Sequence, residues 1–214
     1  MKRSGFFVTG TDTGIGKTVV STTLSVGLKA NYWKPIQTGS REGTDSGFLR
    51  QWIGNDRIWP EAYVFSDPVS PHVAAEGERQ TIELSQILDE YQKISGTVIV
   101  EGAGGLLVPI GVDTLMIDLI LKLELPVILV TSLRLGMINH TLLSLEALRA
   151  RSIPIAGWIS VGDENRSTQR SIESYGSALH LGHIPNCTSF THSWFQTSFQ
   201  KLSLLDLVKE GSHV

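Results

Sequence analysis

Short, continuous runs of apolar residues alternate along the chain with stretches that have helical spacing. The runs are mostly uninterrupted by polar positions, a pattern typical of parallel strands that are covered on both faces. We predict strands over residues 6–9, 32–34, 97–100, 127–131 and 155–160, with a weaker sixth strand over 181–184.

Three of the intervening stretches place apolar residues at helical spacing, over 18–28, 82–94 and 139–150. In the last of these, leucines recur at every third position from Leu142 to Leu148. Strands and helices that alternate over the whole length predict an α/β fold, a parallel sheet with helices on both faces. Because the 214 residues contain no internal repeat and no linker-like segment, we expect a single domain over 1–214.

Two regions do not follow this alternation. Residues 56–78 look like a long irregular loop with three prolines, and loops of that length in compact domains are usually functional. The chain after Asn186 is polar, apart from a possible short terminal helix over 202–208.

Composition and charge narrow the class of protein. Hydrophobic residues make up 41% of the chain, which is enough to build a core and excludes wholesale disorder. The 18 Lys and Arg against 21 Asp and Glu give a net charge of −3, and no basic run is visible. We therefore expect no nucleic-acid binding, whereas a small polyanionic ligand needs only a few well-placed cations.

The chain offers no candidate for a membrane segment or a disulfide. The most apolar stretch, 115–130, is interrupted by charged residues and does not reach the ~18 apolar residues that a span needs. The apolar run near the start, 6–8, is too short for a signal peptide. A single cysteine, Cys187, excludes an intrachain disulfide. We expect a cytoplasmic protein.

The segment from Gly10 to Thr18 reads Gly-Thr-Asp-Thr-Gly-Ile-Gly-Lys-Thr and joins a predicted strand to a predicted helix. This context is the one that a phosphate-binding loop requires. In such a loop Lys17 neutralises the β- and γ-phosphates and the Thr18 hydroxyl is a ligand of Mg²⁺. Thr11 occupies the usual place of the first glycine, so the loop is a variant. An ordinary glycine turn is the weaker interpretation, because Gly-Lys-Thr stands in the right context.

Three further residues are candidates for the same site. Glu101 ends a predicted strand and precedes four small residues, where an acidic residue in this class of fold holds Mg²⁺; alone, it is equally a solvated turn residue. Lys34 lies at the end of another predicted strand, although a lone lysine there is more often a surface charge. Asp45 is either the cap of a helix that runs towards Trp52 or a second metal carboxylate.

Taken together, these segments resemble the dethiobiotin synthase family. The resemblance rests on residues 10–18, on Lys-Pro-Ile-Gln-Thr-Gly at 34–39 and on Glu-Gly-Ala-Gly-Gly at 101–105. Ser-Pro-His at 70–72 and Leu-Gly-Met-Ile-Asn-His at 135–140 also look like segments of that family. The motifs run in order from about residue 5 to about residue 160.

The resemblance implies a role for each matching position. Lys34, Lys17 and Thr13 are the expected catalytic residues, and Thr18, Asp45 and Glu101 are the expected Mg²⁺ ligands. Thr38 and Asn139 are expected to bind the substrate. The expected nucleotide-binding positions are Gly14, Ile15, Gly16, Lys17, Thr18, Val19, Asp45, Glu101, Gly102, Ala103, Gly104, Pro185, Asn186 and Cys187.

The resemblance also implies the reaction and the assembly. The substrates are 7,8-diaminopelargonate, CO₂ and ATP, and dethiobiotin forms by way of a carbamate and its mixed anhydride with phosphate. A homodimer is implied, in which Asn139 helps to bind the substrate's carboxylate across the interface. A plain helix cap is the alternative role for Asn139. We expect His72 and His140 to hold a loop or to pack near an interface rather than to act as bases.

One departure from the family concerns recognition of the nucleotide base. The family usually carries an Asn-Asp pair after its fifth strand, where this chain has Val161 and Gly162. Asp163 and Asn165 follow shortly after, and the Ile-Pro turn at 184–185 is also available through its backbone. We therefore expect a weakened preference for ATP.

Two rival functions share the expected fold. The first is another amide-forming synthase, of the cobyrinate type. The second is a nucleotide-switch ATPase that positions other proteins. A switch often has an amphipathic membrane-binding tail, and residues 202–208 are too short for one.

Overall fold

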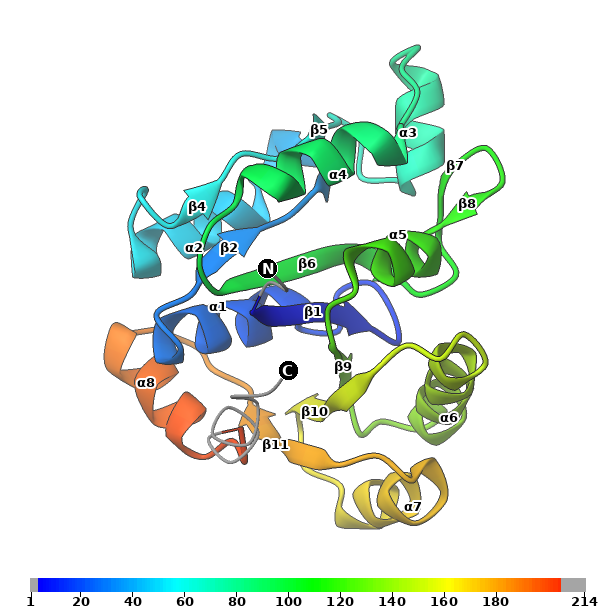
Figure 1. Cartoon of the computed structure of the whole chain (residues 1–214). Helices are drawn as coiled ribbons and strands as arrows, with labels where there is room; N and C mark the ends of the chain where they lie inside the picture. Colours follow the sequence, from blue (N-terminus) through cyan, green and yellow to red (C-terminus); the bar gives the residue numbers. More distant parts are fainter. Residues whose placement is uncertain (1–3, 205–214) are drawn as a thin grey trace.

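A seven-stranded parallel sheet forms the centre of the molecule, in a computed structural model that describes residues 4–204 (Figure 1). The strand order is β11-β10-β9-β1-β6-β2-β4. The strands are β1 (Gly5–Gly10), β2 (Asn31–Trp33), β4 (Ile58–Trp59), β6 (Val98–Gly105), β9 (Val127–Thr131), β10 (Ile155–Gly162) and β11 (His180–Pro185). Their carboxyl ends meet at one edge, which is where open parallel sheets bind ligands.

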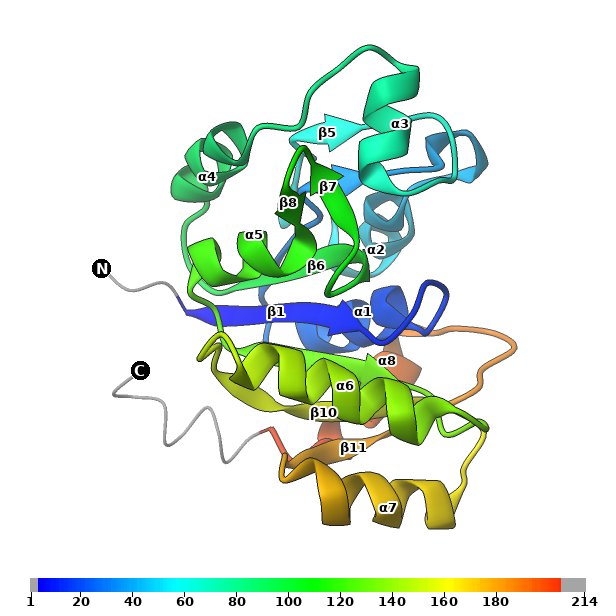
Figure 2. The ribbon, with the colours of Figure 1, turned by 90° about the vertical axis from the view of Figure 1, so that its right-hand side faces the viewer.

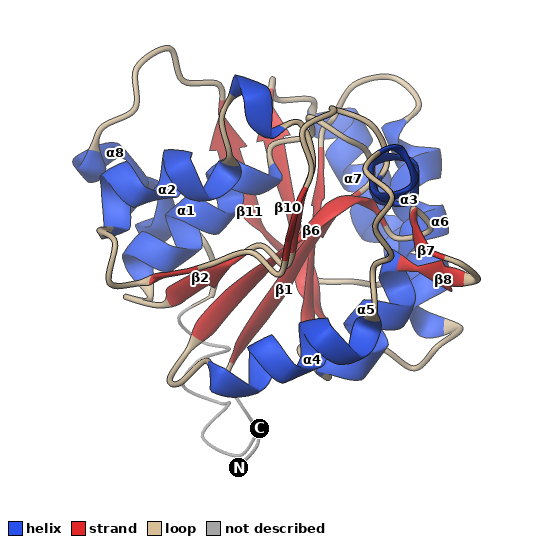
Figure 3. Ribbon diagram, turned by 90° about the horizontal axis from the view of Figure 1, so that it is seen from above, coloured by secondary structure: helices blue, strands red, loops and turns tan. Residues whose placement is uncertain are grey.

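Helices cover both faces of the sheet (Figure 3). One face carries α1 (Lys17–Gly27), α2 (Asp45–Ile53) and α8 (His192–Gln200). The other carries α4 (Leu84–Lys93), α5 (Met116–Leu123), α6 (Met137–Arg149) and α7 (Arg166–Gly176), and α6 and α7 lie side by side over β9, β10 and β11 (Figure 2). The predicted fold, a parallel sheet with helices on both faces, is therefore confirmed.

Successive side chains of the central strands point alternately into two separate hydrophobic cores. Phe7 and Val98 point into the core beneath α4 and α5. Their neighbours Val8 and Ile99 point the other way, into the core beneath α1 and α8. Because both alternating sets are buried, these strands read as continuous apolar runs in the sequence.

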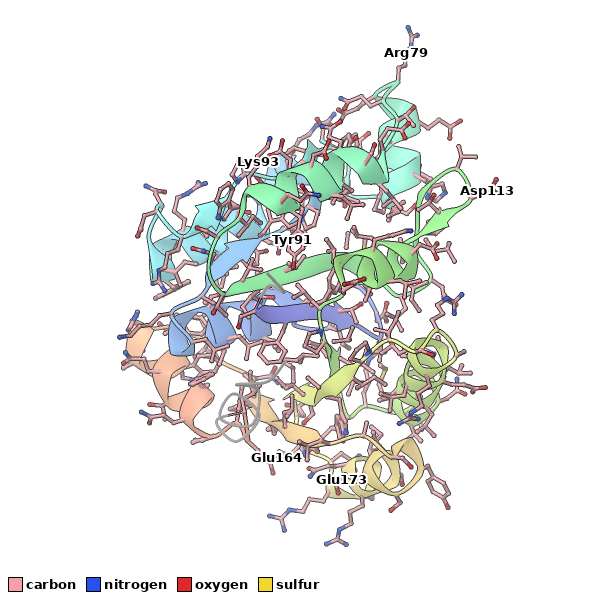
Figure 4. All side chains as sticks on the ribbon, viewed as in Figure 1. Arg79, Tyr91, Lys93, Asp113, Glu164 and Glu173 are labelled. Carbon is pink, nitrogen blue, oxygen red and sulfur yellow. The ribbon has the colours of Figure 1, made fainter. Side chains whose placement is uncertain are left out.

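Helix α4 shows how a surface helix attaches to the sheet. Its Tyr91 is buried and stacks on Trp33 of β2 with ring centroids 5.9 Å apart, whereas Lys93 is exposed and pairs with Glu90 (Figure 4). This division into an apolar and a polar face is the pattern that the helical spacing predicts.

Elements absent from the prediction complete the fold. The supposed loop 56–78 contains β4, β5 (Tyr63–Val64) and α3 (Pro71–Gly77), and β5 pairs with β3 (Ile36–Gln37). A hairpin of β7 (Pro109–Gly111) and β8 (Thr114–Leu115) follows β6, and a 3₁₀ turn (Ser40–Glu42) precedes α2. The predicted terminal helix at 202–208 lies mostly outside the described residues.

The end of β6 also differs from the prediction. The strand continues through the four small residues that follow Glu101, because Gly105 still pairs with Gly10 of β1. Glu101 therefore lies within the strand rather than at its end. Over residues 4–204 the helices are all too short or too polar to cross a membrane.

Candidate nucleotide-binding site

The loop between β1 and α1 has the geometry of a phosphate cradle. Gly14 and Gly16 have φ angles of +67° and +101°, a region that favours glycine. A Cβ atom on Gly16 would also lie 2.8 Å from Cγ1 of Val161, so both conformation and space require glycine there. The loop leads into the N-terminus of α1, whose free N–H groups and dipole favour an anion.

Lys17 lies on the inner side of this loop. Its side chain is buried, and its Nζ donates a hydrogen bond of 2.9 Å to the carbonyl oxygen of Asp12. Burial lowers the pKa of Lys17. The ammonium is thus held at the loop, where a phosphate would need it.

A compact polar centre lies directly beside the loop. The Thr18 hydroxyl is 2.5 Å from Oδ1 of Asp45 and 3.1 Å from Oε1 of Glu101. The Lys34 ammonium forms ion pairs with Oδ2 of Asp45 and, at 3.2 Å, with Oε1 of Glu101. These four residues come from α1, the end of β2, α2 and β6, and the fold brings them together at the carboxyl edge of the sheet.

The charges of this centre depend on one another. Burial by itself would lower the pKa of Lys34, but the carboxylates of Glu101 and Asp45 raise it above its ordinary value. Burial likewise would raise the pKa of Asp45, and the Lys34 ammonium overrides that effect and lowers it. Both groups are therefore charged at neutral pH.

Asp45 does not cap its helix. The N-cap of α2 is Thr44, whose Oγ1 accepts a 3.0 Å hydrogen bond from the backbone N–H of Gly47, and Asp45 is the first helical residue. The capping alternative for Asp45 is therefore wrong. Its side chain instead faces Thr18 and Lys34.

The loop and the polar centre border one cavity of about 360 Å³. Among its lining residues are Thr13, Gly14, Gly16, Val19, Thr38, Ala103 and Gly104, together with the polar centre and Lys17. Gln37 was not predicted, yet it lines the cavity and its Oε1 accepts the backbone N–H of Asp45 at 3.1 Å. Its Nε2 donates a 2.7 Å hydrogen bond to the carbonyl oxygen of Thr38. Gln37 therefore holds the backbone of both Thr38 and Asp45 in place.

The donor set fits the expected Mg²⁺. Two carboxylates and a hydroxyl converge, and a cationic ammonium already lies against both carboxylates. Over residues 4–204, His, Cys, Asp and Glu side chains form no cluster of three or more that suits a metal. Mg²⁺ is usually held by one or two carboxylates plus the phosphates of a bound nucleotide, so a small protein donor set is what it requires.

A second cavity, of about 710 Å³, borders the phosphate loop on its other side. It is lined by Ile15, Val161 and residues of the loops that follow β9, β10 and β11. Asn186 Nδ2 donates a 2.8 Å hydrogen bond to Oδ1 of Asp163 at this cavity. Asn165 instead caps α7, since its Oδ1 accepts the Thr168 N–H at 3.1 Å.

The remaining predicted residues lie outside these two groups. Gly102 is buried within β6, and Pro185 and Cys187 flank Asn186 in the chain. Asn139 is exposed in the first turn of α6, where Gly136 is the N-cap, so it is not a plain helix cap. His72 lies in α3 and links this helix to β7, because its Nδ1 lies 3.2 Å from the carbonyl oxygen of Pro109.

The sheet topology, the glycine cradle and the buried lysine define a nucleotide-binding protein of the phosphate-loop class. A family model described as an AAA domain matches residues 4–193. Two solved structures share the fold: a ParA family ATPase from Chlorobium tepidum and the MinC:MinD complex of Aquifex aeolicus. The first has a TM-score of 0.55 and 15% identity and covers 97% of this chain and 93% of its own. The second has a TM-score of 0.53 and 11% identity, and the match covers 96% of this chain and 89% of that structure's chain.

The sequence relatives identify the family. An "ATP-dependent dethiobiotin synthetase BioD" of Agrobacterium fabrum is 42% identical over 207 residues, which are 95% of this chain and 97% of the relative. The protein of the same name from Paramagnetospirillum magneticum is 46% identical over 180 residues, 84% of this chain and 87% of its own. The chain belongs to the ATP-dependent dethiobiotin synthetase family.

The ion pair of Asp45 with Lys34 predicts a specific pH dependence of stability. The folded state lowers the pKa of Asp45. The ionised carboxylate therefore contributes fully to the free energy of unfolding above the unfolded-state pKa of about 3.9, and this contribution is lost as the pH falls through the folded-state pKa. We expect the difference in unfolding free energy between wild type and Asp45→Asn to be constant near neutral pH and to shrink below about pH 4. Urea unfolding without Mg²⁺ or nucleotide measures it.

The matched control is Asp89→Asn, which removes an exposed carboxylate on α4. An Asp45→Asn difference that stays constant from neutral pH to about pH 2 would contradict the assigned ion pair.

Proposed function

We propose that this protein catalyses the ATP- and Mg²⁺-dependent carboxylation and ring closure of 7,8-diaminopelargonate with CO₂, giving dethiobiotin, ADP and phosphate. The observation that carries the proposal is the convergence of Lys17, Lys34, Asp45 and Glu101 beside Thr38 in a single cavity. The name shared by the relatives supports the choice of reaction.

The proposed chemistry has three steps. An amine of the substrate attacks CO₂ and loses a proton, which gives a carbamate. A carbamate oxygen then attacks the γ-phosphorus of ATP and expels ADP, which gives a mixed anhydride. The second amine attacks the carbonyl carbon of this anhydride, and phosphate leaves as the ring closes.

The site residues match the charge that these steps create. The loop from Thr13 to Val19 binds the triphosphate through backbone N–H groups, and Lys17 balances charge at the β- and γ-phosphates. Lys34 lines the same cavity as the loop and stabilises the negative charge of the carbamate and of the transferred phosphoryl group. Thr18, Asp45 and Glu101 would hold Mg²⁺, which would supply positive charge to neutralise the phosphates. The proposal requires no protein nucleophile.

One assay tests this proposal against its rivals. Purified protein is incubated with bicarbonate, Mg-ATP and diaminopelargonate, and the product is identified by mass spectrometry. Dethiobiotin formed without any protein partner is the expected result. ATP hydrolysis that ignores the diamine and requires a second protein would instead favour a nucleotide switch. An amide product formed only from another acid would favour a cobyrinate-type synthase.

We predict that Lys17→Ala and Lys34→Ala each lower kcat by about 10²–10³, because each removes a cation where phosphate charge develops. Initial rates of dethiobiotin formation measure this loss, and thermal melts confirm that each variant is folded at the assay temperature. Lys29→Ala, in the turn after α1, is the matched control and should retain activity. A normal rate in either site variant would remove that lysine from the mechanism.

We propose that the active form is a homodimer that pairs near the start of α6. Leu107, Leu135 and Leu143 are exposed by 54%, 100% and 56%, and the first and last line a cavity of about 360 Å³ beside the phosphate loop. We predict that a Leu135→Asp, Leu143→Asp double variant is monomeric by light scattering and has a raised KM for the diamine. The control is Leu179→Asp, a substitution of another exposed leucine that should leave the dimer intact. A wild-type protein that is monomeric and active would contradict the proposed dimer.

We predict that ATP is preferred over GTP and CTP by only about tenfold in kcat/KM. Val161 offers no side-chain hydrogen bond, and a specificity bond of this kind contributes about 1–3 kcal/mol. We expect Asn186→Ala to reduce the remaining preference, because the Asp163–Asn186 pair borders the second cavity. Asn165→Ala removes a helix cap and should lower stability by about 0.5–2 kcal/mol without changing selectivity.

The same kinetic comparison separates the alternatives for base recognition. A hundredfold ATP preference that survives Asn186→Ala would mean that backbone groups recognise the base. A preference that is lost in Asn165→Ala alone would identify Asn165 instead.

A further inference from the structure

Tyr32 is a fully buried polar side chain that lies next to the polar centre, and the function described above does not use it. It lies in β2 two residues before Lys34, and its exposed fraction is 0%. Its ring packs in the cluster that includes Leu49 and Ile53 of α2. The hydroxyl donates a 3.1 Å hydrogen bond to Oε2 of Glu101.

The two oxygens of Glu101 have different neighbours. Oε1 faces Thr18 Oγ1 at 3.1 Å and Lys34 Nζ at 3.2 Å, whereas Oε2 receives the hydroxyl of Tyr32. The carboxylate is only 1% exposed, so its orientation depends on these donors rather than on water. Oε1 is therefore the oxygen that faces Thr18 and Lys34, and Oε2 is the oxygen that Tyr32 holds by its hydrogen bond.

These contacts respond differently to the binding of substrates. In the proposed reaction Thr18 would be a ligand of the metal and Lys34 would contact the reacting phosphoryl group, so both would have a second partner besides Oε1. Tyr32 has no such second task, and its packed ring keeps the hydroxyl in place. A phenol hydroxyl carries a proton that it can donate, and Oε2 of Glu101 is the acceptor that the structure places within reach of it.

We propose that Tyr32 is a positioning residue for the metal site, whose hydroxyl holds Oε2 of Glu101 so that Oε1 points at the cation. This inference rests on the proposed function for the assignment of Glu101 as an Mg²⁺ ligand. Hydrogen-bond partners behind a metal ligand orient it, and their loss typically costs 10–100-fold in metal affinity.

The test is Tyr32→Phe, which removes the hydroxyl and keeps the ring. Mn²⁺ binding is measured directly by electron paramagnetic resonance in the presence of a non-hydrolysable ATP analogue. We expect the Kd for Mn²⁺ to rise about 10–100-fold. In steady-state assays the Mg²⁺ concentration for half-maximal rate should rise similarly, while the KM for diaminopelargonate stays unchanged.

Tyr63→Phe is the matched control. Tyr63 is also buried, and its hydroxyl donates to Gln86 Oε1 at 2.8 Å and accepts the backbone N–H of Glu83, away from the polar centre. It should lose stability without any change in Mn²⁺ affinity. A wild-type Mn²⁺ Kd in folded Tyr32→Phe would overturn the proposal and leave Tyr32 a packing residue.

A double-mutant cycle tests whether Tyr32 acts through Glu101. In a Glu101→Ala background, Tyr32→Phe should have no further effect on Mn²⁺ affinity. An additional, full-sized effect there would contradict a positioning role.

If Tyr32→Phe does not fold, Tyr32→p-fluorophenylalanine fills the place of the hydroxyl without providing a donor. The same loss of Mn²⁺ affinity is then expected, and an unchanged affinity overturns the proposal. Because the metal titration needs neither diamine nor turnover, its outcome is independent of whether dethiobiotin is the product.

Discussion

The buried ion pairs of Lys34 with Asp45 and Glu101 are the constraint on which the site depends. Side chains of Lys34 and Glu101 are only 7% and 1% exposed, so neither charge has enough water to stabilise it alone. Removing one partner of such a buried pair typically costs about 3–5 kcal/mol, because the other charge is left uncompensated. The three side chains therefore depend on one another for their ion pairs, and the same mutual dependence fixes their positions.

This constraint explains why the polar centre lies at the carboxyl edge of the sheet. Lys34 follows β2 and Glu101 lies within its neighbour β6, while Thr18 and Asp45 come from the first turns of α1 and α2. The parallel strands and the helices that follow them bring these residues, far apart in the sequence, to one edge beside the glycine cradle.

The sequence predicted the centre of the fold better than its periphery. The buried strands and α1, α4 and α6 carry continuous or periodic apolar runs, so their positions were predictable. Helix α7 is polar apart from Ile172 and Tyr175, and α5 is hidden in the apolar stretch before β9, so neither shows a distinct signal. Lys17, Lys34 and Glu101 were predictable because motifs mark them. Tyr32 and Gln37 were not, because a tyrosine or a glutamine in a short strand becomes informative only when its hydrogen-bond partners are known.

The packing of Val161 shows how the departure from the family pattern fits the rest of the structure. Its side chain lies against Gly16, so closely that a Cβ there would be 2.8 Å away, and it closes the apolar side of the phosphate loop. An apolar residue suits that contact, because a polar group pressed against the loop would lose hydrogen bonds to water. Polar groups at this end of the sheet lie further along, where Asp163 and Asn186 join the loops after β10 and β11. Packing at position 161 and polarity at 163 and 186 are thus separate properties, and a substitution at one need not disturb the other.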